Sequence, residues 1–404
     1  MKGDMYIARS WDKDITEQAE CGGAVTSLLR FALESNRADA VLATEARGGD
    51  RYDGVPVLIT NPDDVIKTAG SLHCASPNIA WMIKEYLEGA FDQKIAVVVK
   101  PCDARGILEL AKRYQIDREN LLLIGVNCTG TLPPEKAKQM LKEEFGVDPS
   151  EVAAEDIEDG KLFITLKDGS EKEKSLAELE EKGFGRRDNC RRCDINIPVM
   201  ADIACGKWGT TDKNTTFVEV CSDKGAEFID AAIGDGYIQT EGADKNAIDA
   251  RKKKDEDAIE AARQCQENDW APFREMSTEE RYSYWFDQFG HCIKCFGCRD
   301  ACPICYCKDC ILEADRDVVA AGEVPPNVLW PMIRITHVMD SCVNCGQCQD
   351  ACPMEIPLAK LIFMLSKELD TVFKHEPGMD VESMPPLRTA TDKELSMETT
   401  ELTL

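Results

Sequence analysis

Histidine is scarce in this sequence, and long apolar runs are absent. Four histidines in 404 residues argue against a histidine-based hydrolase or zinc enzyme. Neither a Ser-His-Asp pattern nor a Walker loop is present. No apolar run approaches the ~20 residues that span a bilayer, and residues 1–12 lack the apolar core of a signal peptide. We therefore expect a cytoplasmic protein without a membrane span.

Basic residues are also in the minority. Acidic residues outnumber them by 74 to 48, which gives a formal net charge of −26. An acidic surface repels phosphate backbones, so we expect no nucleic-acid partner. The excess has two interpretations, an adaptation to solubility or high salt and an acidic docking face for a partner, and composition does not distinguish them.

Cysteine, by contrast, is plentiful. The chain has 20 cysteines, and eleven of them fall between Cys292 and Cys352. A reducing cytoplasm disfavours disulfides, so this clustering indicates metal or iron–sulfur ligation. The length favours two or three domains.

One internal repeat carries the strongest signal. The run from Cys292 to Pro303 matches the run from Cys342 to Pro353, and both end in Asp-Ala-Cys-Pro. The spacing C-x2-C-x2-C-x3-C-P is that of two-cluster ferredoxins, in which the fourth cysteine of each run ligates the other cluster. Zinc is a weaker alternative because zinc sites usually pair two C-x2-C knuckles. The predicted ligands are Cys292, Cys295, Cys298 and Cys352 for one [4Fe–4S] cluster and Cys342, Cys345, Cys348 and Cys302 for the other.

Three further cysteines lie between the two runs. Cys305, Cys307 and Cys310 are not needed by either cluster. They are consistent with a third metal site, with zinc as the candidate ion, or with buried or spare thiols.

The N-terminal half alternates helices and strands. Such units predict a mixed α/β sheet with its functional loops at the strand ends. Residues 151–182 are highly charged, so we expect one strand in a small hairpin and otherwise solvated chain, and the glycines of residues 202–209 predict a tight loop. The predicted helices cover 24–33, 77–87, 104–114, 225–233 and 243–266, and the predicted strands cover 40–43, 55–59, 95–99, 121–126, 161–166 and 217–221.

A looser set of thiols lies in this N-terminal half. Cys102 and Cys128 each follow a predicted strand, and Cys190 and Cys193 form a C-x2-C loop. Four thiols from three loops could hold one more [4Fe–4S] cluster. Cys74 and Cys205 are competing ligands.

Glycine and hydroxyl residues before two predicted helices suggest phosphate binding. Gly22 and Gly23 precede one helix, and Gly70, Ser71 and Ser76 precede the next, where backbone N–H groups bind anions. Capping and turn formation are the alternative. Basic residues that could receive an anionic cofactor or tune a cluster, or simply form surface ion pairs, are Arg47, Arg51, Lys100, Arg105, Arg186, Arg187, Arg191 and Arg192.

Several motifs together resemble a known family. The segments Cys21-Gly-Gly-Ala-Val-Thr-Ser, Lys100-Pro-Cys-Asp-Ala-Arg-Gly, Gly125-Val-Asn-Cys-Thr-Gly and Cys190-Arg-Arg-Cys-Asp are similar to those of the β subunits of coenzyme F420-dependent hydrogenases and dehydrogenases. The ferredoxin module, with its Cys-Pro-Ile-Cys-Tyr-Cys insertion, is most similar to the formate dehydrogenase branch. One departure is Cys205, where the family more often has a non-thiol residue.

The resemblance implies a role in electron transfer. The N-terminal domain would bind FAD and one [4Fe–4S] cluster on Cys102, Cys128, Cys190 and Cys193, and the deazaflavin would dock against the flavin. Formate would be oxidised on a molybdopterin- or tungstopterin-bearing α subunit, and no side chain of this chain need act as a conventional acid or base. The residues expected at the flavin and the deazaflavin are Gly22, Gly23, Thr26, Gly70, Ser71, Ser76, Lys100, Arg105 and Arg186.

The expected fold is α/β, a mixed α+β flavin domain followed by a C-terminal two-cluster ferredoxin-like domain. We expect a flavin domain at 1–242, a helical connector at 243–286, the ferredoxin-like domain at 287–370 and an acidic tail at 371–404, disordered after Lys374. The alternative is a non-catalytic iron–sulfur adaptor to a heterodisulfide reductase or hydrogenase complex. A sulfite or glutamate-synthase-type enzyme would need a sirohaem or amidotransferase module, which the chain lacks.

Overall fold

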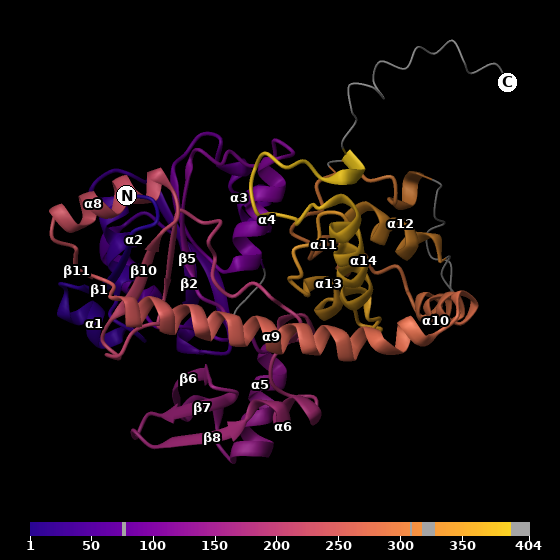
Figure 1. The fold of residues 1–404 in the computed structure, drawn as a ribbon, viewed down its shortest axis with the longest axis horizontal. Coiled ribbons are helices and arrows are strands. Elements are labelled where there is room, and N and C mark those ends of the chain that lie inside the picture. Colours follow the sequence, from indigo (N-terminus) through magenta and orange to yellow (C-terminus); the bar gives the residue numbers. More distant parts are fainter. Residues whose placement is uncertain (75–77, 308, 317–327, 389–404) are drawn as a thin grey trace, which may run out of the picture.

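The main body of the protein is an eight-stranded mixed sheet (Figure 1). The structure is a computed structural model that describes residues 1–74, 78–307, 309–316 and 328–388. The strand order is β11-β1-β10-β9-β5-β4-β2-β3. The strands are β1 (Met5–Ser10), β2 (Ala40–Ala46), β3 (Gly54–Ile59), β4 (Ile95–Val99), β5 (Leu121–Val126), β9 (Ile203–Gly206), β10 (Thr216–Val220) and β11 (Ile238–Gly242).

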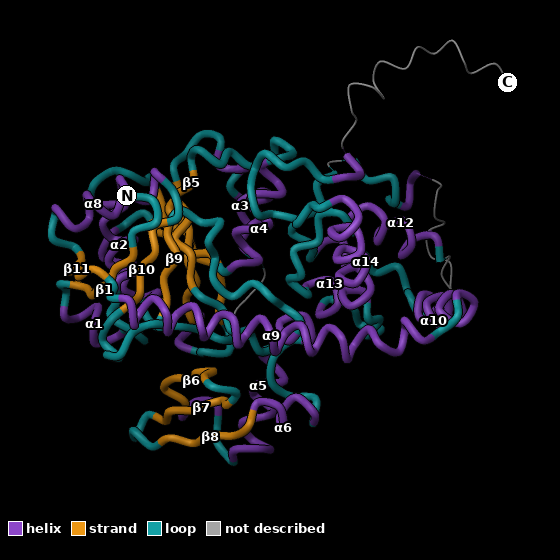
Figure 2. Tube along the Cα trace, viewed as in Figure 1, coloured by secondary structure: helices purple, strands orange, loops and turns teal. Residues whose placement is uncertain are grey.

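Helices cover both faces of this sheet (Figure 2). Successive side chains of a strand point to opposite faces. Val41 accordingly belongs to the core beneath α2 (Ala24–Glu34) and α8 (Asp223–Gly234), whereas Leu42 belongs to the core beneath α3 (Ile79–Tyr86) and α4 (Pro101–Ala111). Strands β2, β4, β5 and β9 are parallel neighbours, so the loops after β4, β5 and β9 meet at one edge.

Most predicted elements of this domain are confirmed. The predicted strands 95–99 and 121–126 coincide with β4 and β5. Helix α4 begins at Pro101, earlier than the predicted residue 104, because the Asp103 carboxylate accepts a hydrogen bond from the Lys100 N–H at 2.9 Å. Helix α3 begins after Asn78, whose side chain accepts from the Ala80 N–H at 3.0 Å.

A small antiparallel sheet forms a separate lobe under the main sheet in Figure 1. Its strands are β6 (Val152–Glu158), β7 (Lys161–Leu166) and β8 (Glu171–Ser175), with α5 (Pro134–Met140), the π-helical segment Leu141–Phe145 and α6 (Leu176–Glu181) beside them. Leu141, Leu162 and Leu179 are buried in its core. The prediction of a mostly solvated segment was wrong because the exposed charged residues of β8 mask the buried apolar ones, and because Glu155 of β6 is buried at 4% exposure in an ion pair with Arg51.

Strand β9 is a second correction. Residues 202–209 were predicted as a tight loop, yet Ile203–Gly206 lies between β5 and β10 in the middle of the sheet. The strand has four residues, and Ile203, Ala204 and Cys205 are all buried. A buried strand this short shows no alternation of apolar and polar residues in the sequence.

A long helix, α9 (Lys245–Glu275), runs along both halves of the molecule in Figure 1. Arg251 forms an ion pair with Glu219 of β10 at 3.0 Å, and near the other end Trp270 packs on Phe363 with ring centroids 5.8 Å apart. The predicted helix over 243–266 is therefore confirmed, and it extends further. Within the described residues, no helix is both long and apolar enough to cross a membrane.

The C-terminal module is built from short helices around the cysteine runs. Trp285, Trp330 and Ile362 are buried in its core. The helices are α10 (Thr278–Gly290), α11 (Gly297–Asp300), α12 (Leu329–Val338), α13 (Gln347–Asp350) and α14 (Leu358–Phe373), and two short helices of the N-terminal part are α1 (Lys13–Gln18) and α7 (Asp188–Arg191).

A buried ion network joins the two halves. Glu109 of α4 is 0% exposed and accepts hydrogen bonds from Lys112 at 2.8 Å and from Arg113 at 2.7 Å. Arg113 also donates to Ser341 Oγ at 2.5 Å, immediately before Cys342. Burial alone would raise the pKa of Glu109, but the two cations outweigh it, so the pKa lies below its usual value.

The segment that follows α14 crosses the junction between the two halves and forms hydrogen bonds with α4. The Gly378 N–H donates to Glu109 at 2.7 Å, and Arg105 Nε donates to the Pro377 carbonyl at 2.7 Å. The prediction of disorder after Lys374 was therefore wrong up to residue 388. It was based on the acidic composition of the segment, which does not reveal contacts made by backbone atoms. Residues 389–404 lie outside the described residues.

Replacing Glu109 tests the importance of the network. We expect Glu109→Gln to lower the free energy of unfolding by about 3–5 kcal/mol, because Lys112 and Arg113 would lose their buried counter-charge. The measurement is urea unfolding of the chain prepared without oxygen. The control is Glu173→Gln, which breaks the exposed pair with Lys161 and should cost about 1 kcal/mol or less. Equal losses in the two variants would contradict the assignment.

Candidate cluster sites and the cavity they lead to

A cavity of about 240 Å³ lies at the edge where the parallel strands end. Lys100 follows β4, Asn127 and Cys128 follow β5, and Lys207 follows β9, so each of these loops contributes to its wall. The N-terminus of α2 forms another wall. Asp156 of β6, a strand of the small sheet, lines the cavity as well. The cavity thus lies between the two sheets.

The start of α2 is shaped to receive an anion. Gly22 and Gly23 both have left-handed φ values, of 57° and 70°. A Cβ at Gly22 would meet the Thr216 nitrogen at 2.8 Å, and one at Gly23 would meet Ile15 Cγ2 at 2.8 Å, so only glycine fits. Among the described residues no side chain caps α2. Its first N–H groups, and the hydroxyl-bearing Thr26, are therefore available at the cavity wall.

The structure brings several of the predicted cofactor residues together. Gly23, Thr26, Gly70, Ser71 and Lys100 line the cavity. Lys100 forms an ion pair with Asp103 at 2.7 Å. Burial would lower the pKa of Lys100, but the charges of Asp103 and Cys102 raise it above its usual value. Ser76 lies outside the described residues.

Arg105 and Arg186 are not among the residues that line the cavity. Arg105 is 5% exposed and donates to the Pro377 carbonyl. Arg186 is partly exposed, donates from Nε to Glu180 at 2.7 Å and packs against Gly130 of the cavity wall. The contact of these arginines with the deazaflavin stays a prediction.

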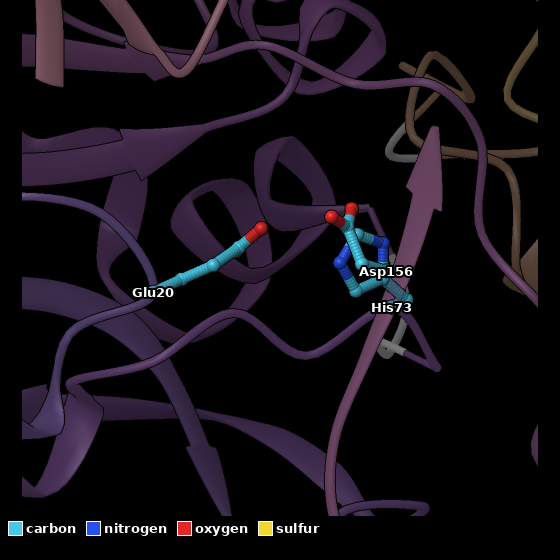
Figure 3. Close-up of side chains that lie close together, drawn as sticks. All are labelled: Glu20, His73 and Asp156. Carbon is cyan, nitrogen blue, oxygen red and sulfur yellow. The ribbon is translucent and has the colours of Figure 1, made fainter. Parts of the chain in front are cut away.

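Three cavity residues were missed by the sequence reasoning. Glu20, His73 and Asp156 line the cavity, and their ligand atoms lie within 4.8 Å of one another. Figure 3 shows the Glu20 carboxylate pointing toward the closely placed side chains of His73 and Asp156. They come from three segments far apart in the chain, so no local motif marks them. The one available signal was His73, a rare residue between two predicted phosphate-binding segments.

A larger hollow of about 1120 Å³ adjoins the cavity. Lys207 and Trp208 line both spaces. The smaller cavity is below the ≈ 300–1,000 Å³ of typical small-molecule sites. A dinucleotide held there would extend beyond it.

The four predicted N-terminal thiols lie together behind this cavity. Burial raises the pKa of Cys128 to about 12 and that of Cys193 to about 11, and the nearby charge of Cys190 raises both further. Burial also raises the pKa of Cys102, with smaller contributions from Cys128 and Cys193. Mutual influence of this kind requires the thiols to be close neighbours. Cys128 also lines the cavity, so the thiol set and the cavity are contiguous.

Cys74 and Cys205 do not belong to this set. The groups whose charges act on Cys74 are Glu155, Arg187, Arg51 and Asp50. Those acting on Cys205 are Arg251, Cys21 and Cys221. Both thiols are buried among apolar side chains.

In the C-terminal module the thiols lie in two groups. As predicted, each group combines the first three cysteines of one run with the last cysteine of the other. Burial raises the pKa of Cys298 to about 12, and Cys292, Cys352 and Cys295 act on it as neighbours. Burial raises the pKa of Cys348 as well, and there the neighbours include Cys302 and Cys342. The last cysteine of each run therefore lies with the first three of the other run.

The two runs also share a backbone conformation. Lys294 and Phe296 in the first run have left-handed φ values of 53° and 61°, and the equivalent Asn344 and Gly346 have 54° and 74°. Three of these four residues are not glycine, and such conformations persist only where the surroundings fix them. Asn344 is fixed by two hydrogen bonds with Asn189, next to Cys190, at 2.6 and 3.1 Å.

The three thiol sets form a series. The charge of Cys298, in the first C-terminal set, raises the pKa of Cys348 in the second. Cys345 is influenced by Cys102, which links the second set to the N-terminal one. The order is Cys292/295/298/352, then Cys302/342/345/348, then Cys102/128/190/193, and then the cavity.

Family models for proteins of known type match most of the N-terminal domain. The model described as "Coenzyme F420 hydrogenase/dehydrogenase, beta subunit N-term" matches residues 5–82, and its C-terminal counterpart matches residues 92–246. The F420-dependent formate dehydrogenase 1 subunit beta of Methanococcus maripaludis is 44% identical over 96% of this chain and 98% of its own length. The chain belongs to this β-subunit family.

Two further relatives place the chain within the family. The F420-dependent formate dehydrogenase subunit beta of Methanocaldococcus jannaschii is 45% identical over 94% of this chain and 98% of its own length. The coenzyme F420 hydrogenase subunit beta of Methanococcus voltae is 27% identical over 59% of this chain and 83% of its own. The match to the hydrogenase relative thus covers a smaller share of this chain.

Two comparisons concern the fold. A solved structure of the F420-reducing [NiFe] hydrogenase complex from Methanosarcina barkeri contains a chain that matches with a TM-score of 0.58 and 22% identity, over 67% of this chain and 94% of that one. The mixed α/β fold is therefore shared with that chain. A 4Fe-4S binding domain is matched at residues 335–357, which include the second cysteine run.

The three additional thiols lie between the two cysteine runs. Burial raises the pKa of Cys305 to about 11, and the charges of Cys302 and Cys307 raise it too. Among the described residues, the group of three or more potential ligands within 4.8 Å of one another contains no cysteine. A zinc site at Cys305, Cys307 and Cys310 stays a prediction.

Substituting single cysteines tests the N-terminal set. We expect Cys102→Ala to remove about four iron atoms per chain, the content of one [4Fe–4S] cluster, because a buried ligand would be lost. The measurement is iron and sulfide content after anaerobic reconstitution, with an EPR spectrum of the reduced protein. The control is Cys205→Ala, which should leave the iron content unchanged. Loss of iron in the Cys205 variant, with retention in the Cys102 variant, would reverse the assignment.

Proposed function

We propose that this chain is the β subunit of an F420-dependent formate dehydrogenase, which carries electrons from formate oxidation through [4Fe–4S] clusters to FAD and then to coenzyme F420. The observation that carries the proposal is the continuous series of three thiol sets that ends at a cavity. The two formate dehydrogenase relatives match almost end to end, which supports the choice of formate.

Twelve cysteines would hold the clusters, in the three sets given above. Burial raises the pKa of Cys128 and Cys298, so iron must displace their protons on binding. Buried cations lie beside them. Arg334 of α12 is 4% exposed and acts on thiols of both C-terminal sets, including Cys298 and Cys348. A nearby positive charge favours the reduced, more negative cluster.

The cavity residues suit a flavin nucleotide. The uncapped start of α2 and the hydroxyl of Thr26 would hold its phosphates, with Ser71 and Lys100 on other walls. Bound there, a flavin exchanges single electrons with clusters and a hydride with a deazaflavin. The adjoining hollow past Trp208 gives room for the part of the dinucleotide that exceeds the cavity, or for the deazaflavin.

The electron donor would be a partner protein. In this proposal formate is oxidised on a molybdopterin- or tungstopterin-bearing α subunit in the cytoplasm, and electrons enter at the Cys292 set, where Cys295 is exposed. A heterodisulfide reductase complex could receive electrons from the same chain. The non-catalytic adaptor is the weaker candidate, because it gives no role to the cavity beside Cys128.

The decisive experiment is anaerobic co-purification of this chain with its α subunit. We expect stoichiometric FAD, about twelve iron atoms per β chain, and formate-dependent reduction of F420. A complex that carries the clusters but neither binds FAD nor reduces F420 would overturn the proposal in favour of an adaptor. Reduction of F420 by hydrogen but not by formate would overturn the choice of donor.

Substitution of Thr26 tests the flavin site. We expect Thr26→Val to weaken FAD binding about tenfold, because a hydrogen bond worth roughly 1.4 kcal/mol to a charged phosphate would be lost. The measurement is FAD titration by fluorescence quenching, with iron content determined in parallel. The matched control is Thr336→Val on α12, an exposed threonine outside the cavity. Unchanged affinity in the Thr26 variant would place the phosphate elsewhere.

A further inference from the structure

Electrons and protons must reach the cavity by different routes. Reducing a deazaflavin to its dihydro form takes two electrons and two protons, whereas an iron–sulfur cluster passes electrons alone. Given the proposed function, on which this inference rests, two protons per turnover must therefore be supplied through the protein. A buried proton donor at the cavity is required by this balance.

We propose that His73, with Asp156 close beside it, is the proton-transfer residue of the cavity and is recharged from solvent through Glu20. All three side chains line the cavity, and their oxygen and nitrogen ligand atoms lie within 4.8 Å of one another (Figure 3). Glu20 is exposed at the solvent side, whereas His73 and Asp156 are partly buried. The group therefore bridges solvent and cavity.

Two atoms without hydrogen-bond partners indicate where a transferred proton would be held. His73 Nε2 and Asp156 Oδ1 are buried atoms for which the described part of the chain provides no hydrogen-bond partner. Leaving a buried polar atom unpaired is unfavourable, so these atoms are suited to a partner that binds and leaves. A bound cofactor and a moving proton both meet that description.

The charged groups around His73 are otherwise engaged. Asp156 Oδ2 is paired with Lys207, and across the cavity Lys100 is paired with Asp103. From the chain before His73, the Ser71 carbonyl accepts from Arg51, which also pairs with Glu155. Imidazole is the side chain that ordinarily changes charge near neutral pH. His73 is the one histidine that lines the cavity.

A metal ion is a poorer occupant of the same group. The Lys207 ammonium already balances the Asp156 carboxylate, so a second cation would be repelled. A proton on His73 brings one positive charge rather than the two of a divalent ion, and its transfer leaves the ring neutral. In each transfer the N–H bond at His73 would break, and solvent would protonate the ring again by way of Glu20. The acceptor of the proton would be a flavin in the cavity that has taken up electrons from the clusters.

The test follows flavin reduction in the intact complex. Reduced methyl viologen, a one-electron donor that carries no proton, is mixed anaerobically with the holoprotein, and the bleaching of clusters and flavin is followed separately. We expect His73→Ala to slow flavin bleaching about 10²-fold, with cluster bleaching and FAD content unchanged. Added imidazole should restore the rate in proportion to its concentration. The control is His337→Ala, an exposed histidine on α12, which should behave as the parent protein.

The outcomes separate this inference from the proposed function. Flavin bleaching at the parent rate in His73→Ala overturns the inference, and so does a slow rate that imidazole does not restore, because that marks a structural role. A parent complex that shows no bound flavin overturns the proposed function instead, before any variant is compared.

Discussion

Glu109 is buried between Lys112 and Arg113, and the placement of both halves of the protein depends on that contact. A lone carboxylate in this position would be very costly, and two lone cations would be costlier still. Because Arg113 also reaches Ser341, the network fixes the loop that carries Cys342 against the α/β domain. The position of the Cys342 loop relative to the α/β domain therefore depends on a salt-bridge network as well as on the linker.

The long helix α9 extends this constraint along the whole molecule. Arg251 ties it to β10, Lys254 to Asp159 beside the small sheet, and Asp269 to Lys360 of α14. The main sheet, the small sheet and the C-terminal module are thus all attached to one long helix. Electron transfer needs such rigidity, because its rate falls steeply with separation, and none of the cysteine sets could hold its position on a flexible tether.

Local signals made the 4Fe-4S binding module and most of the sheet predictable from the sequence. The C-x2-C-x2-C-x3-C runs and the β-branched strand Ile95–Val99 carry their information within a few residues. The predictions that failed were those that depend on contacts between distant parts of the chain. The choice of Cys128 over Cys205 depends on which strand end faces which loop, and the burial of Arg105 depends on a segment some 270 residues away. Strand β9 was not predicted because its four residues show no alternation of apolar and polar side chains.

The segment that follows α14 has a consequence for the order of assembly. Pro377 and Gly378 close over α4 at the junction of the two modules, yet they are among the last described residues of the chain. Every cysteine of the sequence precedes Pro377, the last one being Cys352. The loops that carry the thiols can therefore come together while the junction is open, and the segment that holds Pro377 and Gly378 can close over α4 afterwards.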